Sequence, residues 1–112
     1  NLPPVLAPVK VAVLPLLKKD GLPEKAMEIM NDLKFDYKCA YEEKDTIGKR
    51  YRRQDAIGTP FCVTVDHQTL TDGTVTLRHR DSMQQDRVKI EDLHGIIGEA
   101  VNMRNLFKKI VG

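Results

Sequence analysis

The fold is constrained first by Val9-Lys10-Val11-Ala12-Val13-Leu14, at residues 9–14. This run is short, rich in β-branched residues and almost continuously apolar, which is typical of a strand buried on both faces of a sheet. Pro15 ends the run, and Pro23 with Glu24 then favours the start of a helix with apolar residues at helical spacing. A second strand is expected over residues 35–41. The chain therefore opens with a strand–helix–strand unit.

The middle of the chain predicts a second helix and a third strand. Asp45 is a good N-cap for a helix that runs to about Ala56, and Gly58 with Pro60 provides a clear stop. The apolar run Phe61–Val65 follows at once and has the length and composition of a buried strand.

The last third completes the predicted sheet. Thr71-Asp72-Gly73-Thr74 is a hairpin signal, and residues 75–80 alternate as expected of a returning strand. Residues 83–88 are expected to form an edge strand, and a final helix begins at about Glu91. We therefore expect an α/β fold with a mixed sheet of about five strands and three helices.

Length and composition predict one globular domain. The chain has 112 residues, of which 41% are apolar and 30% charged, and no apolar run approaches the roughly 20 residues needed to cross a bilayer. Residues 1–8 hold three prolines, so we expect an extended linker there, a domain over residues 9–112, and a longer parent chain. Cys39 and Cys62 lack metal or redox spacing and are expected to be buried thiols in a reducing compartment.

The sequence offers little support for an enzyme active site. It contains neither GxGxxG nor a Walker pattern ending in GKS or GKT, and it has no GxSxG nucleophile turn. The histidines, His67, His79 and His94, are scattered. We therefore expect no catalytic residue, no metal site and no cofactor in this chain.

Charge is concentrated between Glu42 and Asp55, and helical geometry sorts it into two sides. One side is expected to hold Ile47, Tyr51, Gln54 and Asp55, and the other Lys49, Arg50, Arg52 and Arg53. Arginine can fork onto phosphate, bond to base edges and stack on bases, so this face favours an RNA partner slightly over an acidic protein. An ordinary solvated helix surface remains the alternative. Arg78 and Arg80 would extend the basic field, and Asp45 would accept hydrogen bonds from a base or cap the helix.

These residues lie in blocks that resemble the carboxyl-terminal domain of the dimeric, eukaryotic or archaeal-like, glycyl-tRNA synthetases. The blocks are residues 6–16, 46–61, 64–66, 74–78 and 80–85. The Ile-Gly element also suits the threonyl, prolyl and histidyl enzymes, whereas Arg80-Asp81-Ser82-Met83 is close to specific for the glycyl type.

The resemblance implies the class IIa anticodon-binding fold and recognition of the tRNA(Gly) anticodon. It also implies an upstream catalytic domain that uses ATP and Mg²⁺, a homodimeric parent enzyme and a cytoplasmic location, with no DNA or membrane partner. The anticodon site would comprise Asp45, Arg50, Arg52 and Arg53, joined by Lys49 of the basic face, with Arg78 and Arg80 as secondary candidates. Two rivals remain: a protein-binding accessory module of the same fold, and a nucleotide-binding enzyme of flavodoxin-like layout.

Overall fold

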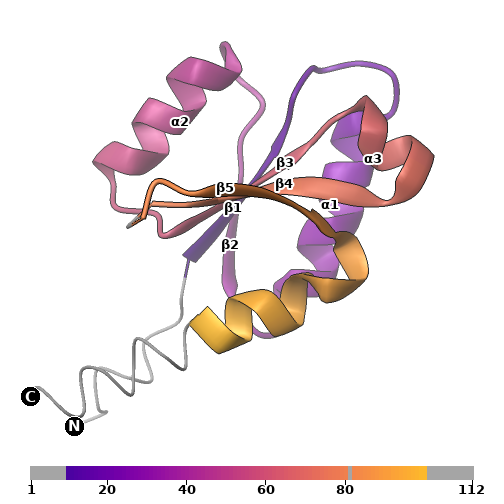
Figure 1. Cartoon of the computed structure of the whole chain (residues 1–112). Helices are drawn as coiled ribbons and strands as arrows, with labels where there is room; N and C mark the ends of the chain where they lie inside the picture. Colours follow the sequence, from indigo (N-terminus) through magenta and orange to yellow (C-terminus); the bar gives the residue numbers. More distant parts are fainter. Residues whose placement is uncertain (1–9, 81, 101–112) are drawn as a thin grey trace, which may run out of the picture.

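The computed structural model describes residues 10–80 and 82–100 (Figure 1). The elements are, in order, β1 (Lys10–Pro15), α1 (Leu22–Leu33), β2 (Lys38–Tyr41), α2 (Ile47–Ala56), β3 (Phe61–Val65), α3 (His67–Asp72), β4 (Thr74–His79) and β5 (Gln85–Lys89). A 3-10 turn (Ile90–Asp92) then leads into α-helical residues 93–100. The expected linker over residues 1–8 and the end of the last helix lie outside the described residues.

The strands form the mixed sheet of five that was expected, in the order β2-β1-β3-β4-β5. β1 pairs in parallel with β2 and β3, whereas β4 pairs antiparallel with both β3 and β5. The register places Val13 beside Val63 and Val63 beside Leu77, so these three side chains share one face. The predicted mixed α/β fold is confirmed.

Helices cover the two faces of the sheet unequally (Figure 1). α1 and residues 93–100 pack on one face, which we call the α1 face, against an apolar core that includes Val13, Val63 and Leu77. α2 packs on the other face, the α2 face, where the buried apolar cluster consists of Ala12, Leu14 and Cys62. Alternation along each strand produces this division, because neighbouring residues point to opposite faces.

α3 was not expected: the described residues contain four helical segments, one more than the three predicted. The Asp66 carboxylate accepts a hydrogen bond from the Thr69 backbone N–H, and the Thr69 hydroxyl accepts one from the Asp66 N–H. This capping box starts a short helix, and Gly73 ends it at a left-handed φ of 71°. The predicted hairpin turn at residues 71–74 is therefore the end of α3 and the start of β4.

Three element boundaries also differ from those predicted. Thr46, not Asp45, is the N-cap of α2, because its side chain accepts from the Lys49 N–H and Asp45 has a left-handed φ of 69°. β2 begins at Lys38 because the residues before it turn back onto Leu33, whose carbonyl accepts from the Tyr37 N–H. The edge strand is β5, displaced toward the carboxyl end from residues 83–88. No helix among the residues shown in the structure is long and apolar enough to span a membrane.

Candidate nucleic-acid interface

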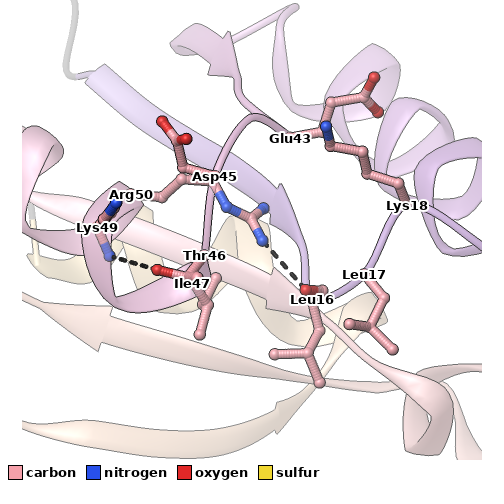
Figure 2. A pocket seen from close by; sticks show the side chains of 9 residues that line it. All are labelled: Leu16, Leu17, Lys18, Glu43, Asp45, Thr46, Ile47, Lys49 and Arg50. Atoms are coloured by element: carbon pink, nitrogen blue, oxygen red, sulfur yellow. Dashed lines mark hydrogen bonds between the residues drawn. The ribbon is translucent and has the colours of Figure 1, made fainter.

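A hollow of about 560 Å³ lies where β1 and β2 end and α2 begins (Figure 2). Three segments line it: the loop after β1, the loop after β2 and the first turn of α2. Their lining residues are Leu16, Leu17, Lys18, Glu43, Asp45, Thr46, Ile47, Lys49 and Arg50. Open α/β sheets commonly bind ligands outside the carboxyl ends of their parallel strands, and this hollow has that position.

Two lysines from different segments reach the hollow. Lys18 follows β1, and Lys49 lies in the first turn of α2. Both are exposed, and the N-terminus of α2 adds a partial positive charge at the same place. Lys49 was expected there, whereas Lys18 was missed. The one signal for Lys18 was its position just after a buried parallel strand, because residues at such strand ends meet at one edge of the sheet.

Arg50 does not belong to an exposed basic face, and that prediction is wrong. Its side chain is 2% exposed and points inward beneath the loops that line the hollow. The guanidinium donates to the carbonyl oxygens of Pro15, Leu16 and Glu42. Burial lowers the pKa of Arg50, and the nearby Glu42 carboxylate opposes that shift. Helical spacing gives the angular position of Arg50 around α2, but it does not show that the ends of β1 and β2 cover this side chain.

Arg53 and Asp45 contact each other at the edge of the hollow. Arg53 Nη1 donates to Asp45 Oδ2 at 3.0 Å, Nη2 donates to the Lys44 carbonyl at 3.1 Å, and the guanidinium also contacts the Glu42 carboxylate. The hydrogen bond from Arg53 lowers the pKa of Asp45. Both side chains stay more than 40% exposed, so the pair contributes little to stability and can be exchanged for other partners.

Arg52 is the arginine of α2 that best fits the predicted basic face. It is exposed, and its guanidinium makes no hydrogen bond or ion pair with any residue that the structure describes. Because it has no such partner, the five N–H donors of its guanidinium are available to a partner molecule. Arg52 and Lys49 are therefore the cations of α2 that are exposed and form no ion pair with a described residue.

Arg78 and Arg80 lie at the opposite end of α2 from the hollow. Arg78 forms a two-pronged ion pair with Asp55, both N–O distances being 3.0 Å, and its guanidinium lies 4.8 Å from the centre of the Tyr51 ring. Arg80 Nε donates to the Asp55 carbonyl at 3.2 Å. The expected continuous basic field from α2 to β4 is therefore interrupted by internal pairing at Asp55.

Histidine and cysteine side chains do not converge on a second site in the described part of the chain. His67 pairs with Asp20 at 2.9 Å, and His79 packs edge-on against Phe61. Cys62 is buried and Cys39 half-buried, both as free thiols, and burial raises the pKa of Cys62 to about 11. Within residues 10–80 and 82–100, no group of three or more potential metal ligands is close enough to hold a metal ion.

Comparison with known sequences shows that the chain is similar to part of several glycine–tRNA ligases. The chain is 55% identical over 97 residues to glycine–tRNA ligase of Borrelia hermsii. This match covers 87% of this chain and 22% of the relative. It is 60% identical over 90 residues to glycine–tRNA ligase of Treponema denticola, covering 80% of this chain and 20% of the relative. The chain thus spans about a fifth of the length of these relatives. Both are bacterial, so the eukaryotic or archaeal-like subtype is not confirmed.

A solved structure and a family of domains also match the chain. The structure resembles prolyl-tRNA synthetase from Cryptosporidium parvum in complex with L-proline and AMP, with a TM-score of 0.80 at 23% identity, covering 96% of this chain and 24% of that one. At this identity the likeness shows the fold alone. The family described as the anticodon binding domain matches residues 10–100. The chain therefore belongs to the anticodon-binding domain family.

Proposed function

We propose that this chain recognises the anticodon of a glycine-accepting transfer RNA, as the anticodon-binding domain of a glycine–tRNA ligase. The observation that carries the proposal is the hollow at the start of α2, which Lys18 and Lys49 line, together with the exposed Arg52 about one turn further along the helix. Its support in sequence is the identity of 55% and 60% to glycine–tRNA ligases. The ligation itself, with ATP and Mg²⁺, belongs to the rest of the parent enzyme, which we propose to be a cytoplasmic homodimer.

The charge distribution favours binding of a polyanion on the α2 side of the domain. α1, on the other face, exposes the carboxylates of Glu24, Glu28 and Asp32. α1 thus carries three carboxylates and one cation, Lys25, whereas α2 carries four cationic side chains and one carboxylate, Asp55. Phosphates are attracted to α2 and repelled by α1, so the RNA approaches the domain in one orientation.

The residues around the hollow suit different parts of an anticodon loop. The ammonium groups of Lys18 and Lys49 would hold phosphates, which position an RNA without identifying its bases. Asp45 would accept a hydrogen bond from the exocyclic amine of an unstacked base after exchanging its exposed pair with Arg53 for the RNA. Arg52 would bind a base edge or a neighbouring phosphate. Arg78 and Arg80 are secondary candidates because binding there would have to compete with Asp55.

Titration of the chain with a glycine-accepting tRNA over a series of salt concentrations tests this function. Two phosphate contacts, or three if Arg52 also binds a phosphate, predict that affinity falls with salt at a logarithmic slope of about −1.5 to −3. A tRNA with an altered anticodon should bind more weakly than the natural one. A protein-binding accessory module would bind neither RNA, and a nonspecific basic surface would bind both RNAs equally. Either result would reject the proposal.

A further inference from the structure

One buried guanidinium connects all three segments that line the hollow. Arg50 donates through Nη1 to the carbonyl oxygens of Pro15 and Glu42. Through Nη2 it donates to the carbonyl oxygen of Leu16 at 3.1 Å, the bond drawn in Figure 2. Pro15 and Leu16 are the end of β1 and the residue after it, and Glu42 directly follows β2. Arg50 itself lies in α2. The ends of two strands and the start of a helix are thus joined at a single side chain.

The burial of this cation is not explained by packing. Arg50 is 2% exposed, its Nε atom is buried without a hydrogen-bond partner, and no carboxylate bonds directly to its guanidinium among the described residues. Moving a charge out of water is costly, and well-packed apolar side chains commonly replace buried ionic groups without loss of stability. A guanidinium differs from an apolar side chain in fixing the directions of several carbonyl groups at once.

The carbonyl groups that Arg50 binds lie two or three residues before polar side chains that line the hollow. Lys18 follows Leu16 by two residues, and Asp45 follows Glu42 by three. Lys49 directly precedes Arg50 in α2. The separation of these three functional groups therefore depends on where the guanidinium holds the two strand ends relative to the helix.

We infer that Arg50 is a positioning residue for RNA recognition, which it supports without touching the RNA by holding Lys18, Asp45 and Lys49 in one arrangement. This inference rests on the proposed function. A displacement of about 1 Å in a supporting group is enough to loosen a site that depends on several converging contacts. Loss of Arg50 should therefore reduce discrimination between anticodons more than it reduces the general attraction for RNA.

The test compares Arg50→Lys and Arg50→Met with the control Lys89→Met, which removes an exposed cation of β5 that does not line the hollow. Discrimination is measured as the dissociation constant for a tRNA with an altered anticodon divided by that for the glycine-accepting tRNA. We expect both Arg50 variants to lower this ratio about tenfold, because neither lysine nor methionine can hold three carbonyls from two strands. Lys89→Met loses one charge, as Arg50→Met does, but lies outside the hollow and should keep the discrimination ratio of the unaltered chain.

The ratio separates positioning from simple destabilisation. Partial unfolding weakens the binding of both RNAs by the same factor and leaves their ratio unchanged. If circular dichroism shows that an Arg50 variant is largely unfolded, all the proteins are titrated in trimethylamine N-oxide, which favours compact states. Faster amide hydrogen exchange at residues 43–46 in the RNA-free variants is expected as a second result.

Each alternative outcome contradicts a defined statement. If the unaltered chain discriminates between the two RNAs and the Arg50 variants discriminate equally well, the positioning role is wrong while the proposed function stands. If Arg50→Met loses discrimination and Arg50→Lys restores it, Arg50 acts through its charge alone and the inference is also overturned. If the unaltered chain binds neither RNA, both the inference and the proposed function fail.

Discussion

The two faces of the sheet are built from the same strands but from different kinds of side chain. On the α1 face, β1, β3 and β4 contribute Val11, Val13, Val63, Val65, Val75 and Leu77, all of them buried. On the α2 face β1 and β3 contribute a small apolar cluster, and the helix adds the buried polar side chains of Arg50 and Gln54. Thr64 and Arg78 lie on this face too, bonded to Tyr51 and Asp55 of α2.

The two faces therefore contribute differently to the protein, one mainly to stability and the other to the orientation of functional groups. Apolar burial provides most of the free energy of folding, and the α1 face holds most of the buried apolar side chains. Hydrogen bonds and ion pairs contribute less net free energy but fix directions, and the α2 face holds Arg50 and the Arg78–Asp55 pair. Substitutions on the first face should therefore change stability, and substitutions around α2 should change recognition.

The largest expected effect is on the α1 face. Leu77 is fully buried in β4, so Leu77→Ala should lower the free energy of unfolding by about 2 to 5 kcal/mol, through lost burial and the cavity left behind. Urea denaturation followed by circular dichroism measures this change. Leu70, which is 48% exposed in α3, provides the matched control, and Leu70→Ala should change stability by less than about 1 kcal/mol. Equal losses for the two variants would contradict the assignment of the core to this face.

The next effect concerns recognition at α2. Arg52→Ala should weaken binding of the glycine-accepting tRNA by about 1 to 3 kcal/mol if the side chain contacts a base, while leaving the free energy of unfolding within about 0.5 kcal/mol. Filter binding or fluorescence anisotropy measures the first quantity and urea denaturation the second. An equal loss for cognate and anticodon-altered tRNA would assign Arg52 to a phosphate. If the variant binds both tRNAs as tightly as the unaltered chain, Arg52 does not belong to the site.

A smaller effect is expected at the far end of α2. Arg78 is paired with Asp55 in a partly shielded position, with side-chain exposures of 13% and 31%. Arg78→Ala should destabilise the chain by about 1 to 2 kcal/mol, which combines the value of a charge-assisted pair with that of the contact on Tyr51. A double-mutant cycle with Asp55→Ala isolates the pair. A coupling free energy near zero would show that α2 is held to β4 by other contacts.

The smallest effect is a dependence on acid at the N-cap of α3. Hydrogen bonds from Arg87 lower the pKa of Asp66 below its ordinary value of 3.8, with further bonds from Thr69 acting in the same direction. Because the pKa of Asp66 is lower in the folded state, the ionised carboxylate stabilises the fold at pH values above its unfolded pKa. This stabilisation is lost as the pH falls through the folded pKa. Asp66→Asn, which keeps a capping oxygen, should therefore show a weaker fall in melting temperature below about pH 4. Identical acid profiles would show that Asp66 does not contribute through its charge.

Much of the fold was predictable because its signals are local. The run through Leu14 and the run Phe61–Val65 are too apolar and too β-branched for any place but a sheet interior, and both are buried strands. The α3 helix was not predicted because its six residues carry no apolar periodicity, and a capping box of Asp66 and Thr69 starts it. Thr46 was missed as an N-cap because Asp45 has an equally suitable side chain and only the backbone angles separate the two.

The site was predictable only in part. Helical spacing identified a basic face, and the structure leaves Lys49 and Arg52 on the surface as expected. Spacing did not indicate that Arg50 lies inside, because one of the two strand ends that cover it, at Pro15 and Leu16, lies more than 30 residues earlier in the chain. For the same reason Lys18 was overlooked, since the loop after β1 meets α2 only in the folded chain.

The sequence by itself determined the order and type of most elements, the α1 face of the core and the position of the basic segment, because these depend on burial patterns within a few residues. The tertiary structure alone decided which cations face solvent, which of them are paired, and which loops converge on the hollow. The physical reason is that an arginine takes its role from the groups that surround it. Carbonyl oxygens enclose Arg50 and a carboxylate binds Arg78, whereas no described residue pairs with the side chain of Arg52.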